Sequence, residues 1–306
     1  MANDKRIDQP TGTEIVGHEW DGIEELNSPL PRWWLWTFYL TILFSIAYAI
    51  AYPAWPMLTK GTEGVLGWTS RGQLAEEMSA AEAARAGTLA KIAAADLATL
   101  STDDPLWQQA RAGGAAAFKV HCSQCHGTGA AGSQQLGYPN LNDDDWLWGG
   151  DLAAIEYTIT HGIRQPDEYQ RQGAMPPFAG VFEPAQLAAL AQHVRSLSGL
   201  DRPNGQGAEI FAANCASCHG DNGQGMRSIG APNLSDAIWL RGSSADAIKA
   251  QVLSPKMGVM PAWGDRLDPA TIKMLTIYVH SLGGGEKSVP VETVATGPVS
   301  EADVQQ

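Results

Sequence analysis

One pattern, C-x-x-C-H, occurs twice in this chain and constrains it more than any other feature. The two copies of the pattern occupy residues 122–126 and 215–219. In c-type haem attachment the two thiols bond covalently to the porphyrin and the adjacent imidazole binds the iron. The sequence therefore predicts two covalently bound haem c groups. The residues that would hold them are Cys122, Cys125, His126, Cys215, Cys218 and His219.

Other uses of paired cysteines fit this chain less well. A thioredoxin-like dithiol would need a single C-x-x-C beside a βαβ pattern, and that pattern is absent. Such a dithiol also does not require a histidine next to each pair of cysteines. A four-cysteine zinc site usually places its two pairs about 15–20 residues apart, whereas a domain's length separates them here. All 4 cysteines belong to the two motifs, so none is left over for a structural disulfide.

Length and charge narrow the class of protein. The 306 residues are enough for two small domains with additional segments. The formal net charge of −13 argues against nucleic acid as a partner, and it favours solubility or docking to a cationic protein.

A long apolar stretch follows the polar residues 1–31. No charged residue lies between Arg32 and Lys60, and a helix from about Pro31 to Tyr52 would span roughly 33 Å at ~1.5 Å per residue, which matches a bilayer core. Tryptophans and tyrosines stand at both ends, as in aromatic belts, and Pro53 and Pro56 end the helix. No small-residue cleavage site follows. Residues 32–56 are therefore predicted to be an uncleaved transmembrane anchor that contacts lipid.

The haem motifs lie after the anchor and fix its orientation. Covalent haem attachment takes place outside the bacterial inner membrane, so residues 1–31 are expected in the cytoplasm and the haem domains in the periplasm. The next segment, 57–103, is predicted to be a helical connector. Its apolar stripe should pack on a haem domain or on a partner subunit, and it consists of Leu89, Ile92, Leu97 and Leu100.

The chain then contains an internal repeat. At an offset of 93 the motifs coincide, Gly114 matches Gly207 and Phe118 matches Phe211; at an offset of 85, Met175 matches Met260. The first copy therefore has eight extra residues between about His161 and Met175. We expect domain 1 at 104–200, domain 2 at 201–284, and a disordered tail at 285–306, which has no periodic apolar face.

Each copy reads as a helix into the motif, a glycine-rich loop, a middle helix, a Met-Pro loop and a final helix. This order resembles a class I cytochrome c domain. The predicted fold is all-α: one N-terminal transmembrane helix followed by two tandem class I cytochrome c domains.

The same resemblance implies the iron ligands. His126 and His219 would be proximal, and Met175 and Met260 distal. Repeat order pairs His126 with Met175 and His219 with Met260. Met257 is a rival to Met260, and His161 or His121 could replace Met175. Pro139 and Pro232 resemble the proline whose carbonyl accepts a hydrogen bond from the proximal imidazole, although either could be a simple turn proline.

A more specific resemblance lies before and into the anchor. Residues 17–27, read as GHEWDGIEELN, and residues 29–34, read as PLPRWW, are similar to the N-terminal signature of the membrane-anchored dihaem subunit of cbb3-type cytochrome c oxidases, the CcoP or FixP family. Ser28 departs from the asparagine usual there. The resemblance extends from about residue 17 to residue 284.

This resemblance implies an electron-transfer subunit in aerobic respiration at low oxygen. Its donor would be a soluble or membrane-bound cytochrome c, and its partners the monohaem cytochrome c subunit and the catalytic haem-copper subunit that reduces oxygen. The subunit would have no catalytic residues of its own. A free-standing dihaem cytochrome, a dihaem peroxidase and a haem-based gas sensor are the alternatives, and the last two require an iron with an open or displaceable sixth ligand.

Overall fold

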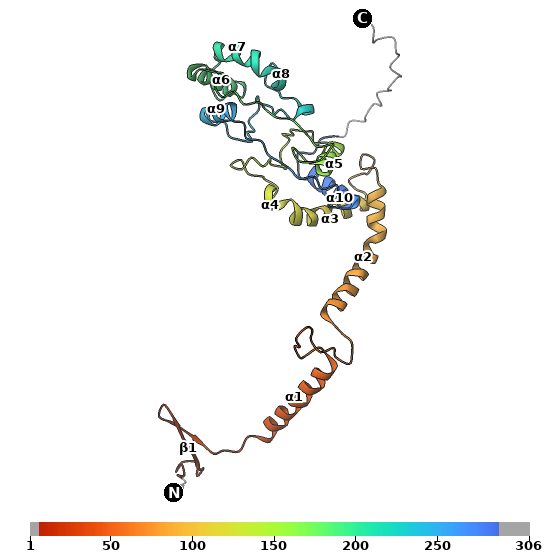
Figure 1. Ribbon diagram of the computed structural model, residues 1–306, viewed down its shortest axis with the longest axis vertical. Coiled ribbons are helices and arrows are strands. Elements are labelled where there is room, and N and C mark those ends of the chain that lie inside the picture. The colour runs from red at the N-terminus through yellow and green to blue at the C-terminus, as the bar shows by residue number, and fades with distance from the viewer. Residues whose placement is uncertain (1–5, 288–306) are drawn as a thin grey trace. The chain divides into compact units, whose positions relative to one another are not determined.

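The computed structural model describes residues 6–287, which divide between two compact units, 1–84 and 85–306. The predicted tail is described only as far as residue 287, and its remainder lies outside the described residues. In the first unit, β1 (Ile15–Trp20) and β2 (Ile23–Leu26) form an antiparallel hairpin (Figure 1). Asp21 and Gly22 turn the chain with φ values of 48° and 84°, which is the backbone of a two-residue hairpin turn. The sequence analysis missed this hairpin.

Helix α1 (Arg32–Ala51) is the apolar helix expected from the sequence. An 18-residue stretch of this 20-residue helix has a mean hydropathy of 1.6, and none of the helix residues is buried, so the helix is long and apolar enough to cross a membrane. Hydroxyl groups within it donate to the preceding turn, as Thr37 does to the Trp33 carbonyl at 2.9 Å and Ser45 to the Thr41 carbonyl at 2.8 Å. These bonds satisfy the few polar side chains of the span.

Helix α2 (Ser70–Ala94) runs from the first unit into the second, and its C-terminal part belongs to a core of the second unit. Ile92 and Leu97 are buried there against Trp107 and Ile277, and Leu89 and Leu100 pack on the same cluster. The predicted apolar stripe thus packs on a haem-motif body.

The second unit is built from helices. In chain order they are α3 (Pro105–His121), α4 (Ser123–His126), α5 (Leu152–His161), α6 (Pro184–Leu197), α7 (Gly205–Asn214), α8 (Ala216–His219), the 3₁₀ turn η1 (Arg227–Ile229), α9 (Ala245–Leu253) and α10 (Pro269–His280). Asparagine, aspartate or serine side chains cap the N-termini of α3, α5, α7, α9 and α10. The mostly helical fold expected from the sequence is confirmed.

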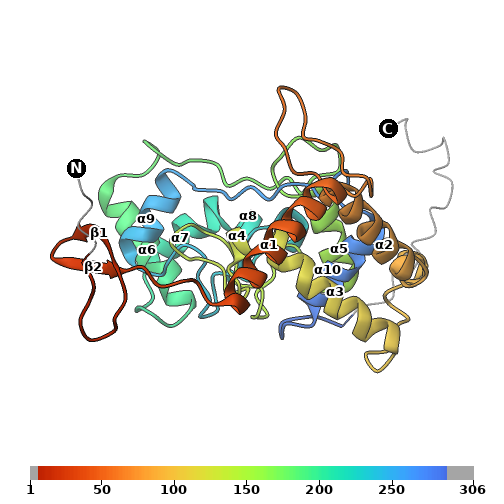
Figure 2. The same ribbon diagram turned by 90° about the horizontal axis from the view of Figure 1, so that it is seen from below.

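The helices assemble in an order that crosses the two repeats. Helix α10 packs on α3 and α5, whereas α6 packs on α7 and α9, and Figures 1 and 2 show the blue α10 beside the yellow α3. We call α3, α4, α5 and α10 the first body, and α6, α7, α8 and α9 the second body. Each body therefore takes its final helix from the other repeat.

Glycines allow the same close helix crossing in both bodies. In the first body Gly114 of α3 lies against the main-chain carbonyl of Met274 in α10. In the second body Gly207 of α7 lies equally close to the carbonyl of Ala189 in α6. Gly114 and Gly207 match at the offset of 93, and Ala189 and Met274 match at the offset of 85. The repeats thus conserve the crossing while exchanging the partner helix.

The short connection between α6 and α7 explains this exchange. Only residues 198–204 join the two helices, and connections of this length make consecutive helices antiparallel neighbours. Helix α6 therefore packs on α7 and leaves the surface of α3 to α10. The ranges 104–200 and 201–284 remain a prediction about repeats in the sequence, and they do not coincide with the two packed bodies.

Candidate functional site

The first motif lies where α3 meets the one-turn helix α4. Cys122 is the last residue before α4 and is half-buried, Cys125 is exposed, and His126 ends the helix. Phe118, one turn before the motif, is 1% exposed and its ring lies 6.4 Å from that of His126. The two thiols and the imidazole thus follow one another on a single turn, which is the local arrangement that covalent haem attachment needs.

The second motif repeats this geometry between α7 and α8. Cys215 is buried, Cys218 is exposed, and His219 is 9% exposed. Phe211 stands one turn earlier and is 1% exposed.

Each motif histidine has the same partner in its own repeat. The Nδ1 atom of His126 lies 3.2 Å from the Pro139 carbonyl oxygen, and Nδ1 of His219 lies 3.1 Å from that of Pro232. A carbonyl can only accept, so each Nδ1 carries the proton and each Nε2 lone pair is free for a metal. The contact expected between each histidine and the carbonyl of Pro139 or Pro232 is therefore present.

Burial sets the protonation states at both motifs. It lowers the pKa of His126 and His219 against the opposing effect of the proline carbonyls, which keeps both imidazoles neutral and able to bind iron. Burial, helped by the neighbouring motif cysteine, raises the pKa of Cys122 and Cys215 to about 11.

The two methionines lie in the opposite bodies from those expected. Met260 packs with Phe118 and Cys122 in the core of the first body. Met175 packs with Phe211 and Cys215 in the core of the second body. This packing disagrees with the pairing of His126 with Met175 and of His219 with Met260, which followed repeat order, because each Met-Pro loop precedes a final helix that packs on the other repeat.

Main-chain hydrogen bonds fix the exchanged loops. Met260 donates to and accepts from Ile163 at 3.0 and 2.9 Å, and the Trp263 N–H donates to the Ile159 carbonyl at the end of α5. In the second body the Phe178 N–H donates to the Val252 carbonyl of α9 at 3.0 Å. The Met260 loop is thus held to the first body by several main-chain bonds, and the Met175 loop is held to the second body by one.

The rival ligands lie elsewhere. Met257 and Met226 are 43% and 40% exposed. His161 bonds to Asp167 at 3.2 Å and stands between the rings of Tyr157 and Tyr169. His121 packs edge-on against Trp263 at 5.3 Å. Within residues 6–287, Met175 and Met260 are the methionines that pack with the motif cysteines.

Several donors in the second unit are also suited to a haem. Trp148 Nε1, Trp239 Nε1 and Arg241 Nε are buried and have no hydrogen-bond partner among the described residues. Trp148 and Arg241 match at the offset of 93. Haem carries two propionate carboxylates, which are acceptors for such donors. These donors, the thiols, the imidazoles and the thioethers together fit a c-type haem at each motif.

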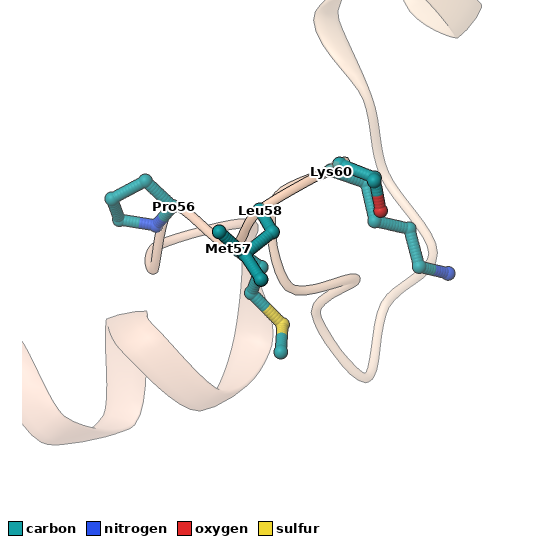
Figure 3. Close-up of a pocket in the computed structure, with 5 residues that line it drawn as sticks. Pro56, Met57, Leu58 and Lys60 are labelled. Atoms are coloured by element: carbon teal, nitrogen blue, oxygen red, sulfur yellow. The ribbon is translucent and has the colours of Figure 1, made fainter.

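Two hollows differ in their relation to the motifs. One is lined by residues 56–60 of a single exposed loop and contains none of the predicted site residues (Figure 3). The other, of about 200 Å³, lies between the loop after the first motif and residues 238–240 of the second copy. Pro139 and Trp239 line this hollow, and Pro139 is the residue whose carbonyl accepts from His126.

Two family models match the chain. Residues 12–59 match the N-terminal domain of cytochrome oxidase-cbb3, FixP, and residues 109–194 and 203–279 match cytochrome c oxidase, cbb3-type, subunit III. The first match includes the hairpin and α1, and the second contains both haem motifs.

Curated relatives are similar over nearly the whole chain. The cbb3-type cytochrome c oxidase subunit FixP of Rhizobium meliloti is 52% identical over 286 residues, which cover 92% of this chain and 98% of the relative. The FixP subunit of Azorhizobium caulinodans is 51% identical over 92% of this chain and 96% of its own length. The CcoP subunit of Cereibacter sphaeroides is 46% identical, with 91% and 97% covered.

Proposed function

The chain belongs to the FixP/CcoP family, subunit III of cbb3-type cytochrome c oxidase, and on this premise we propose that it relays electrons through two c-type haems. The electrons come from a soluble or membrane-bound cytochrome c and pass through the monohaem subunit to the haem-copper subunit. One observation carries the proposal: each C-x-x-C-H motif has a proline-bonded histidine and a methionine in the same core.

A haem held at each motif would supply a one-electron Fe(II)/Fe(III) couple. Cys122 and Cys125 attach the first and Cys215 and Cys218 the second. His126 with Met260, and His219 with Met175, complete the ligand sets. The Pro139 and Pro232 carbonyls hold the imidazole rings in one orientation and tautomer. With an imidazole and a thioether of the chain bound to each iron, such haems would exchange electrons and would not bind substrate.

The exchanged ligation is tested by labelling one haem and changing each methionine. A chain with Cys122→Ala retains Cys125 and His126, so its first haem is joined by a single thioether and its α-band moves to longer wavelength. In this background Met260→Leu should abolish the low-spin spectrum of the first haem, which is recognised by its displaced α-band, and leave the spectrum of the second haem unchanged. Met175→Leu should do the reverse.

The opposite assignment would restore the repeat-order pairing and overturn the exchange. A pyridine haemochrome titration of the unaltered chain checks the premise, and it should give two haems that resist extraction by acidic acetone. A value of one haem removes the proposal altogether.

We place residues 1–31 in the cytoplasm and both bodies in the periplasm of the bacterial inner membrane. Within residues 6–287 one helix is of membrane length and has no buried residue, and the family consists of membrane oxidase subunits, which supports the membrane anchor. The side of the membrane rests on the haem motifs, since covalent haem attachment takes place outside the inner membrane. Protease added to spheroplasts should remove the haem-stained bodies. Cleavage of those bodies only in inside-out vesicles would show the opposite topology and contradict this placement.

The hairpin and the start of α1, residues 17–34, are proposed to serve assembly with the other oxidase subunits. Trp20 and Ile23 of the hairpin are 67% and 70% exposed, so their apolar surface is free for a partner. Replacing residues 17–34 by an unrelated sequence of equal polarity should leave the haem spectra intact while oxidase activity falls. Full activity in a normally stable complex would contradict this role.

A further inference from the structure

The eight-residue insertion of the first repeat contributes an arginine with no counterpart in the second. Arg164 has a positive φ of 50°, and its N–H donates to the Arg171 carbonyl at 3.0 Å. This closes the inserted loop on itself, directly after Ile163, which holds Met260 through two main-chain bonds. The insertion therefore lies beside the distal loop of the first body and continues into that of the second.

The Arg164 side chain contacts both distal loops at the same point of the repeat. Its Nε donates to the Gly258 carbonyl at 2.7 Å, and its Nη1 donates to the Gly173 carbonyl at 2.6 Å. Gly258 is two residues before Met260, and Gly173 is two residues before Met175. One guanidinium thus joins equivalent main-chain atoms of the two methionine loops.

The planar guanidinium is well suited to this double contact. Its donors point in fixed directions, so two bonds to separate carbonyls determine the separation of the loops. Hydrogen bonds from a charged donor are stronger than those from a neutral donor. The Gly173 loop has little freedom to move in response, since a Cβ there would overlap the main-chain carbonyl of Ile229.

No other role in the described residues accounts for this cation. Arg164 is half-buried, and none of the ion pairs within residues 6–287 includes it. Burial lowers the pKa of the Arg164 guanidinium, and the charge of the nearby Arg241 lowers it further. The polar contacts of the Arg164 side chain within residues 6–287 are those with the two loop carbonyls, which points to the positioning of those loops.

We infer that Arg164 is a positioning residue shared by both haem sites, which couples the two distal methionines by holding their loops with one side chain. The inference rests on the proposed ligation, in which Met260 serves the first iron and Met175 the second. Its consequence is reciprocal: loosening one iron–sulfur bond weakens the other, because both loops share the same restraint.

Displacement of the methionines by imidazole measures this coupling on the full chain in detergent. In the unaltered protein, Met175→Leu should raise the imidazole affinity of the ferric first haem, which Met175 does not touch, on the order of tenfold. In the Arg164→Gln background this cross effect should disappear, and the affinity of both haems should already be raised. A tenfold change corresponds to about 1.4 kcal/mol.

Arg171→Gln is the matched control. Arg171 lies in the same inserted loop, burial also lowers the pKa of its guanidinium, and the change removes the same charge. Its side chain bonds to Thr158 and lies over the Tyr157 ring, and it donates to neither methionine loop. This variant should keep the cross effect. Equal behaviour of the Arg171 and Arg164 variants, or a response at one haem alone, would overturn the inference.

Arg164→Lys decides the matter if Arg164→Gln cannot be isolated with both haems. Lysine keeps the charge but lacks the fork that reaches two carbonyls, so haem content should be retained while the cross effect is lost. An undiminished cross effect in this variant would also overturn the inference. The near-infrared band of Met-ligated ferric haem is recorded first on the unaltered chain. Absence of this band would refute the proposed methionine ligation and would not test the role of Arg164.

Discussion

Adjacent glycines on α3 allow the helix crossing of the first body to be tested within a matched pair. A Cβ at Gly114 would overlap the Met274 carbonyl and the Cβ of Tyr278, both of which belong to the packed face of α10. A Cβ at Gly113 would meet only the Sδ end of the Met274 side chain, which is flexible and can move aside. Gly114→Ala should therefore force the helices apart, whereas Gly113→Ala should be accommodated.

The magnitude follows from two terms. Each substitution gains about 1 kcal/mol of helix propensity, and this gain cancels when the two variants are compared. Overpacking of a well-packed core costs about 1–3 kcal/mol, and only Gly114→Ala incurs it. The variants should therefore differ by about 1–3 kcal/mol, or about 2–12 °C in melting midpoint at the usual 2–4 °C per kcal/mol for a folding unit of about 150–250 residues, the size of the two bodies together.

The assay is thermal unfolding of the detergent-solubilised chain, followed by far-UV circular dichroism and by the near-infrared band of Met-ligated ferric haem. The band of the first haem should be lost at a lower temperature in Gly114→Ala than in Gly113→Ala. Gly207→Ala should give the corresponding loss at the second haem, because its Cβ would overlap the Ala189 carbonyl. Identical midpoints for the two α3 variants would refute the crossing as described.

Three further outcomes are expected. Burial, and after it the charges of Asp236 and Asp143, raises the pKa of Asp145 to about 6. The protonated Asp145 therefore contributes stability that is present below the unfolded pKa and lost as the pH rises through about 6. Asp145→Asn should stabilise the chain by about 1–2 kcal/mol at pH 7 but not at pH 4, as measured by urea midpoints. Arg227 bonds both Glu286 oxygens at 2.6 and 2.9 Å on the surface, and Arg227→Ala should cost at most about 1 kcal/mol, less at high salt. A protease site placed in residues 198–204 should give a cleaved chain whose halves stay together without denaturant and separate in detergent denaturation.

Local sequence signals predicted most of the individual elements. The charge-free run gave the membrane-length helix to within one residue of its observed ends at Arg32 and Ala51. Both motifs, and the prolines that accept from their histidines, follow from patterns within a few residues of chain. Such features depend on short-range covalent spacing, and tertiary packing only completes them.

The exchange of final helices could not be read from repeat register, which describes ancestry of the segments and not their packing. Repeat register paired each methionine with the motif before it. A signal for the exchange was present in the connection of residues 198–204, because so short a connection favours the packing of α6 and α7 as antiparallel neighbours. The hairpin was missed in the same way, although Asp21-Gly22 between alternating side chains is a two-residue turn signal.

The exchange also changes how the two haem sites depend on one another. In tandem domains joined by a linker, each site could open without disturbing its neighbour, and the distance between the irons would depend on a docking interface. Here the first body needs α10, and the second needs α6, so neither core is complete without chain from the other repeat. Local opening of one body must pull on segments that order the other. The main chain itself therefore fixes the relation between the two motifs.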